Sequence, residues 1–134
     1  MSREFVVSRR QMLAGSAAVA GAGTWVSMAW ANEALTAPHG RGIRVLLHDR
    51  RVAPDAALQS RLLARDARIV MLGDDPVRQW RDDSAIWLAQ PDASVLGITR
   101  WPDFLVLRGL AAESRRHVRF ASSVSDGVLT WLIA

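Results

Sequence analysis

Residues 43–72 read IRVLLHDRRVAPDAALQSRLLARDARIVML. Two short apolar runs, 43–48 and 68–72, flank a segment in which Leu58, Leu62 and Arg65 recur at helical spacing. Pro54 precedes that segment and suits the first position of a helix, where its missing N–H costs nothing. The stretch therefore predicts a strand, a helix and a second strand, the unit that joins two parallel neighbours in a sheet.

The same alternation continues beyond residue 72. Pro76 opens a second predicted helix, residues 94–99 (SVLGIT) form a third apolar run, and Pro102 opens a third helix. The second helix has one stripe that is expected to be buried, at a period of 3.6 residues, made of Val77, Trp80, Ser84, Trp87 and Leu88. The third helix has its own stripe, made of Phe104, Leu107, Leu110 and Ala111. The tryptophans of the second helix suit either core packing or a face that docks a partner.

The chain ends in a predicted hairpin. Residues 117–124 and 128–133 form two strands, joined by the strong turn signal Asp126-Gly127. Three strand–helix alternations favour parallel strands covered by helices. The expected fold is thus a small three-layer α/β domain over residues 43–134, with a parallel sheet in the flavodoxin-like order 2-1-3-4. The fifth strand is expected at the edge or beside the fourth, running antiparallel, and Leu46 and Val70 are expected to be deeply buried.

The N-terminal segment has the layout of an export signal. Residues 8–13 read SRRQML, a weakly hydrophobic Ala/Gly run follows, and residues 29–31 read AWA. This layout resembles the signal peptides of the bacterial twin-arginine translocation pathway, whose pattern is Ser/Thr-Arg-Arg-x-Phe-Leu-Lys. The chain keeps four positions of that pattern, namely Ser8, Arg9, Arg10 and Leu13. It has Met12 where Phe is usual and Ala14 where Lys is frequent.

The resemblance implies that the protein engages the twin-arginine translocase and crosses the membrane already folded, meeting the membrane only transiently. Cleavage after Ala31 would leave residues 32–42 as a flexible linker and would place the domain in the periplasm or outside the cell. Two alternatives stay open for this segment: an ordinary secretory signal, and an uncleaved anchor over residues 13–31, whose length nominally spans a bilayer. Its Ala, Gly and Ser content makes it a poor lipid-facing helix.

Composition excludes several classes of function. All 17 basic residues are arginine, and there is no cysteine. Without Arg3, Arg9, Arg10 and Glu4, which leave with the signal, the chain has 14 arginines and 12 acidic residues, so it lacks the excess charge of a nucleic-acid-binding protein. The absence of cysteine excludes thiol catalysis, iron–sulfur clusters, covalently attached haem and a lipoprotein anchor. The absence of lysine excludes Schiff-base chemistry and a P-loop.

The most promising residues for a site follow the predicted parallel strands. In an open α/β sheet, ligands bind at the carboxyl ends of the strands, where the strand order reverses. For the order 2-1-3, the loops at 48–51 and 99–103 meet there, and they contain Arg50, Arg51, Arg100 and Trp101. Guanidinium groups and helix N-termini favour a carboxylate or phosphate, so we expect Arg50, Arg100 and Trp101 to bind a small anion. The competing interpretation is a salt-bridged surface, with Asp49, Asp74 and Asp103 neutralising the arginines.

Catalysis has weaker support. His48 and Asp49 are the candidates for a base and its carboxylate, but adjacent strand residues point to opposite faces. No nucleophile elbow, no metal-binding pattern and no nucleotide-binding motif is present in the sequence, so neither a metal nor a cofactor is predicted. The sequence favours an exported binding or accessory module that takes a small anion or docks to another exported protein. The alternative is a compact, hydrolase-like periplasmic enzyme that acts at the same rim of the sheet.

Overall fold

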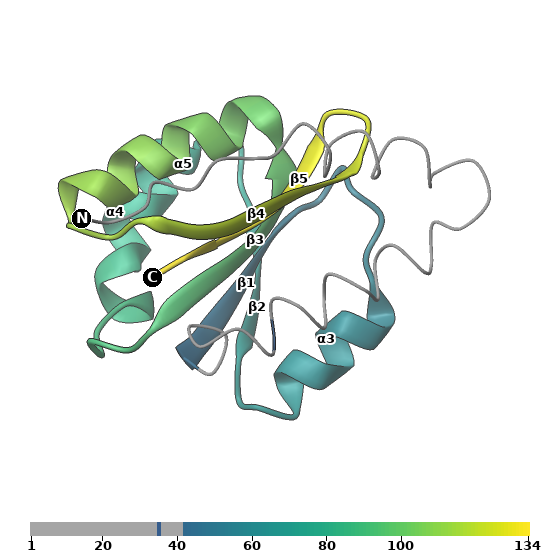
Figure 1. The fold of residues 1–134 in the computed structure, drawn as a ribbon, viewed down its shortest axis with the longest axis horizontal. Helices are drawn as coiled ribbons and strands as arrows, with labels where there is room; N and C mark the ends of the chain where they lie inside the picture. Colours follow the sequence, from purple (N-terminus) through teal and green to yellow (C-terminus); the bar gives the residue numbers. More distant parts are fainter. Residues whose placement is uncertain (1–34, 36–41) are drawn as a thin grey trace.

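A mixed five-stranded sheet forms the centre of the protein (Figure 1). The computed structural model describes residue 35 and residues 42–134. Along the chain, the strands and helices are β1 (Ile43–Asp49), α3 (Ala56–Leu63), β2 (Arg68–Leu72), α4 (Pro76–Trp87), β3 (Ser94–Arg100), α5 (Trp101–Glu113), β4 (Val118–Ser125) and β5 (Val128–Ile133). The strands lie in the order β2-β1-β3-β5-β4. The predicted α/β class and the predicted alternation of strands and helices are confirmed.

The first three strands are parallel neighbours, as predicted. β1 pairs with β2 on one side and with β3 on the other, so that Leu46 faces Ile69 in one ladder and Leu96 in the other. Each connection carries one helix across the sheet. Because parallel strands all point the same way, the loops that follow β1, β2 and β3 meet at a single edge of the sheet.

The predicted order is wrong next to β3, where the neighbour is β5 and not β4, whereas the prediction that β5 runs antiparallel beside β4 is confirmed. β5 lies between β3 and β4 and runs antiparallel to both, so the sheet is mixed and its order is not 2-1-3-4. The composition of the two strands explains the arrangement. β5 reads VLTWLI and is buried from Leu129 to Ile133, whereas β4 carries Arg119 and three serines. A strand that is mostly apolar gains most from a central place, and a more polar strand tolerates the edge.

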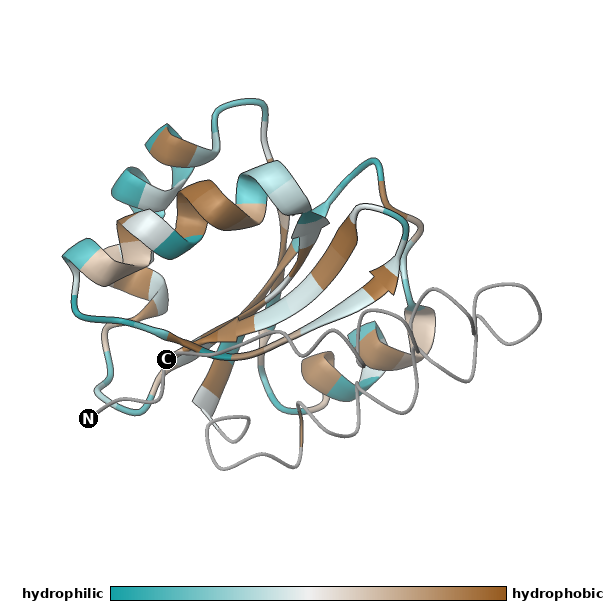
Figure 2. Ribbon diagram, turned by 45° about the horizontal axis from the view of Figure 1, so that its top comes forward, coloured by the Kyte–Doolittle hydropathy of each residue, from teal (hydrophilic) through white to brown (hydrophobic). Residues whose placement is uncertain are grey.

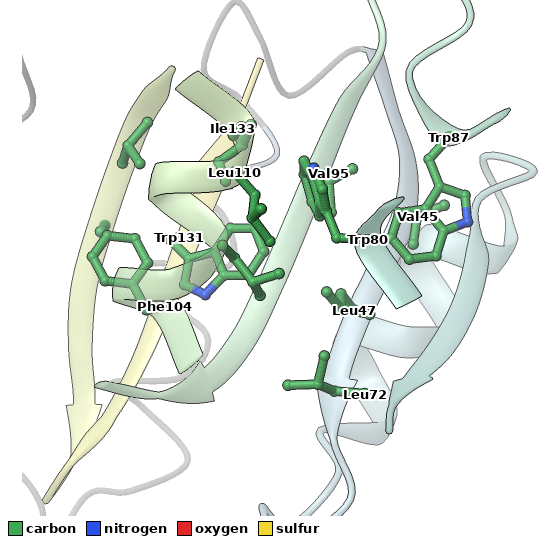
Figure 3. Packing of buried hydrophobic residues seen from close by; sticks show 14 of the residues in the cluster. Val45, Leu47, Leu72, Trp80, Trp87, Val95, Phe104, Leu110, Trp131 and Ile133 are labelled. Carbon is green, nitrogen blue, oxygen red and sulfur yellow. The ribbon is translucent and has the colours of Figure 1, made fainter. Parts of the chain in front are cut away.

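Helices cover both faces of the sheet, which gives the predicted three layers (Figure 1). α4 and α5 lie on one face and α3 lies on the other. Beneath α4 and α5, the buried residues include Phe104 and Trp131, whose ring centroids are 6.1 Å apart (Figure 3). Trp80 and Trp87 contact each other edge to face in the same cluster, and both are buried. Core packing thus accounts for the tryptophans of α4, and the alternative of a docking face formed by them is not supported.

A second cluster lies on the α3 face of the sheet. Leu58 and Leu62 of α3 pack there with Leu46, Leu96 and Leu132. Leu35 belongs to the same cluster and is buried, and its carbonyl oxygen accepts a hydrogen bond of 3.3 Å from Arg65 Nη1. Figure 2 shows hydrophobic residues both on the strands of the sheet and in the helices that cover it.

Two expectations about local structure need correction. Pro54 does not open α3; the helix begins at Ala56, because Asp55 caps it by accepting a hydrogen bond from the Leu58 amide at 3.0 Å. Val70 is only half-buried, since β2 is an edge strand, whereas Leu46 is fully buried as predicted. Pro76 and Pro102 lie in the first turns of α4 and α5, as predicted.

The predicted export signal, with Ser8, Arg9, Arg10, Leu13 and the cleavage position Ala31, lies outside the described residues. So does the predicted linker, apart from Leu35 and Gly42. Over the part of the chain that the structure describes, no helix is long and apolar enough to cross a membrane.

Candidate functional site

The rim at the carboxyl ends of the parallel strands brings together segments far apart in the sequence. The loop after β1, the start of α5 and the β4–β5 turn all reach this edge (Figure 1). The turn is there because β4 ends, and β5 begins, on the side where β3 ends. The Trp101 amide donates a hydrogen bond of 3.0 Å to the Gly127 carbonyl, which ties the turn to the first residue of α5.

A hollow of about 600 Å³ opens between these segments. Its walls are residues 51–53 from the first loop, residues 100–102 at the start of α5, and residues 124–128 of the hairpin. The lining is partly apolar, with Val52, Val124, Val128 and the half-exposed ring of Trp101, and partly charged, with Arg51, Arg100 and Asp126. Its size falls in the range of small-molecule sites, which is roughly 300–1,000 Å³.

Arg100 is the exposed last residue of β3 and lines the hollow. Its backbone is held by the hydroxyl of Thr99, which donates to the Arg100 carbonyl at 3.2 Å. Its guanidinium group makes no hydrogen bond and no ion pair with any residue that the structure describes. Its charge still acts over a longer range, since it helps to lower the pKa of Asp49. Arg100 therefore keeps its five donors for a ligand.

Arg51 also lines the hollow, but its guanidinium group is already bound. Nε and Nη2 donate to the two carboxylate oxygens of Asp49, each at 3.0 Å, and Nη2 donates to Asp103 at 3.2 Å. Burial by itself raises the pKa of Asp49, but the hydrogen bonds and charge of Arg51, with the charge of Arg100, outweigh it and lower that pKa. The hydrogen bond with Asp49 in turn raises the pKa of Arg51. Arg51 therefore links Asp49 of β1 to Asp103 of α5, and its charge is already neutralised.

Arg50 forms an ion pair away from the hollow. Its guanidinium group pairs with Asp74, which follows β2, and Arg50 is not among the residues that line the hollow. Of the three residues predicted to bind an anion, the structure brings Arg100 and Trp101 together at the hollow and leaves Arg50 outside it. The salt-bridged interpretation describes Arg50 and Arg51, whose partners are Asp74, Asp49 and Asp103, but not Arg100.

His48 and Asp49 do not form a catalytic pair in the structure. Both are buried, with 1% and 2% of their surfaces exposed. His48 Nε2 lies 2.9 Å from the Val52 carbonyl, which makes it the donor, while the Asp49 carboxylate is bound by Arg51. His48 Nδ1 has no hydrogen-bond partner among the described residues. Neither side chain lines the hollow, so neither reaches a ligand there.

The hairpin residues of the site were missed from the sequence. The sequence predicts a turn at Asp126-Gly127, but the predicted order 2-1-3-4 puts β4 next to β3 and so puts that turn farther from Arg100. The signal that points to a central place for β5 is its composition, in which every residue except Thr130 is apolar.

No metal centre is evident in residues 42–134: no three His, Asp or Glu side chains lie close enough to hold an ion there. No protein-family model matches this chain, and neither does any of the curated proteins or solved structures with which it was compared. The function of the site therefore has to be inferred from its own geometry.

Proposed function

We propose that this protein is a small exported binding module that takes an anionic group of a small molecule in the hollow between β3, α5 and the β4–β5 turn. The observation that carries the proposal is Arg100. Arg100 lines the hollow and its guanidinium group has no ion pair with any described residue, while Arg50 and Arg51 are neutralised by aspartates. A charge-assisted hydrogen bond to a carboxylate contributes about 1.5–3 kcal/mol.

Two further features support binding at this place. The amide groups at the start of α5 have no side-chain cap, and a helix N-terminus favours negative charge. The hollow also has apolar walls, including the exposed ring of Trp101, against which the uncharged part of a ligand can pack.

Calorimetric titration of the full chain with 3-phenylpropionate, an aromatic carboxylate, tests the proposal. We expect saturable binding that Arg100→Ala weakens tenfold or more, since tenfold corresponds to about 1.4 kcal/mol. Arg81→Ala is the matched control, because Arg81 is an exposed arginine on α4 and lies outside the hollow. Equal affinities of wild type and Arg100→Ala, or no saturable binding, would reject the anion site.

We further propose export by the twin-arginine pathway, on the strength of residues 8–13 and the weakly hydrophobic run that follows. The double variant Arg9→Lys with Arg10→Lys should leave precursor in the cytoplasm, while Arg3→Lys, which lies outside the motif, should export normally. Fractionation and N-terminal sequencing of the product give the readout. Normal export of the double variant, or a mature N-terminus far from Asn32, would contradict the assignment.

A further inference from the structure

The charges around the hollow do not add up to a site for a multiply charged anion. Arg51 is shared by two carboxylates, those of Asp49 and Asp103, so this trio carries one negative charge in excess. Arg100 is the one cation of the lining without an ion pair among the described residues, and Asp126 adds a further negative charge. A phosphate dianion would add two negative charges to a lining that already contains Asp126 and one free guanidinium group, whereas a single carboxylate matches the single guanidinium group of Arg100.

Asp126 supplies the second polar element. It is exposed at the tip of the hairpin, lines the hollow, and makes no hydrogen bond or ion pair with any residue that the structure describes. Its position relative to Arg100 is constrained: Arg100 pairs with Val128 in the β3–β5 ladder, and the Trp101 amide holds Gly127 at 3.0 Å. Arg100 and Asp126 thus line one hollow with opposite charges, yet they do not form an ion pair with each other.

The third element is the apolar wall. Val52, Val124 and Val128 are partly buried and line the hollow together with Trp101, which is 37% exposed. Trp101 is held in place by Phe104, whose ring centroid lies 5.7 Å away. A held aromatic ring beside branched aliphatic side chains suits an apolar group of a ligand.

From these three elements we infer that the hollow binds a zwitterion with an apolar side chain, of which a free apolar α-amino acid is the simplest. Its carboxylate binds Arg100, its ammonium group binds Asp126, and its side chain packs against Trp101 and the valines. The inference rests on the proposed function, because it assigns the anionic group to the same site, and it adds a requirement for a positive charge next to that group.

Four probes separate the requirements when the full chain is titrated with each. L-phenylalanine carries both charges, N-acetyl-L-phenylalanine only the negative one, L-phenylalanine methyl ester only the positive one, and inorganic phosphate has no apolar part. We expect L-phenylalanine to bind at least tenfold more tightly than any of the other three. Asp126→Asn should remove that preference over the N-acetyl form. The variant keeps the fold, because Asn-Gly is as good a two-residue hairpin turn as Asp-Gly.

Asp82→Asn is the matched control, since Asp82 is exposed on α4, lies outside the hollow and pairs with Arg78. It should leave all four affinities unchanged. If N-acetyl-L-phenylalanine binds as tightly as L-phenylalanine, or if Asp126→Asn leaves the preference intact, the zwitterion inference is wrong while the anion site stands. If phosphate binds most tightly, the inference is also wrong. If neither carboxylate probe binds, the proposed function itself fails.

Discussion

The indole Nε1 of Trp131 donates a buried hydrogen bond of 2.9 Å to the hydroxyl of Thr99. The same hydroxyl donates to the Arg100 carbonyl at 3.2 Å. The Thr99 side chain thus accepts from the indole N–H of the fully buried Trp131 and also holds the backbone of the residue that we propose binds the ligand. The partnership crosses the β3–β5 ladder, so it exists only because β5 lies next to β3.

Thr99→Val should destabilise the protein by about 1–3 kcal/mol, because it leaves the buried Trp131 Nε1 without an acceptor at nearly unchanged volume. Thr99→Ser keeps the hydroxyl and should therefore reduce the free energy of unfolding less than Thr99→Val does. Urea unfolding followed by tryptophan fluorescence measures both. Equal stabilities of the valine and serine variants would show that the hydrogen bond contributes nothing.

Gly97→Ala should also destabilise the protein, by about 1–3 kcal/mol or more, through overpacking. A Cβ atom at residue 97 would lie 2.0 Å from Trp131 Cζ2, and Phe104 packs beside that ring, so the ring has little room to move. In a background of Trp131→Leu, the same glycine substitution should cost far less. A double-mutant cycle on unfolding free energies tests this coupling, and purely additive effects would contradict the clash.

The pair of Asp49 and Arg51 makes stability depend on pH. The folded-state pKa of Asp49 is lowered, so the stability that it contributes is present above the unfolded value of about 3.9 and is lost as the pH falls through the lowered folded value. Arg51→Gln should raise the pKa of Asp49, because burial then has less to oppose it. The stability difference between wild type and variant should therefore be largest near neutral pH and shrink below pH of about 4.

Arg50→Gln is the control for that experiment. Arg50 pairs with Asp74, whose side chain is 86% exposed, and exposed pairs contribute about 0–1 kcal/mol. Unfolding curves between pH 2 and 7 should show almost no effect of this variant. If the stability difference between wild type and Arg51→Gln does not change with pH, the lowered pKa of Asp49 is not its cause.

Arg116 fastens the chain before β3. Its Nη1 and Nη2 donate to the carbonyl groups of Pro91, Ala93, Leu88 and Gln90, at 2.9–3.2 Å. Arg116→Lys keeps the charge but not the planar fork, and should cost about 1–2 kcal/mol, near the lower end for charge-assisted bonds because the group is partly exposed. Arg115→Lys, at an exposed neighbour, should cost nothing measurable. Thermal unfolding measures the stability of both variants. Equal melting temperatures would show that the hydrogen bonds of Arg116 do not stabilise the chain before β3.

The stability lost when a core residue is truncated to alanine should depend on the position of its strand in the sheet. Leu46→Ala should cost about 2–5 kcal/mol, because Leu46 is fully buried on the central strand β1. Val70→Ala should cost clearly less, because Val70 is half-buried on the edge strand β2. Denaturant titrations decide the order, and a larger loss at Val70 would show that the edge strand packs more tightly than its burial indicates.

Local patterns were sufficient for most of the elements. Short apolar runs predicted β1, β2 and β3, and the 3.6-residue stripe predicted the four buried residues of α5. Pro76 and Pro102 marked helix starts correctly, since a proline in the first turn acts through nearby backbone alone. The α/β class followed from the same alternation, because one apolar face per helix has to be covered by a sheet.

Three features depended on tertiary structure. The place of β5 between β3 and β4 is decided by pairing between distant segments, and it brings Asp126 to the rim. Arg51 lines the hollow and Arg50 does not, because the loop after β1 directs Arg50 toward Asp74. The sequence alone does not show which of two adjacent arginines faces the hollow. Arg100 has no ion-pair partner among the described residues because the nearby aspartates Asp49, Asp74 and Asp103 pair with Arg50 and Arg51. Only the tertiary structure shows which arginine each aspartate pairs with. Sequence periodicity determines which residues face inward, but contacts across the sheet decide which charged groups remain for a ligand.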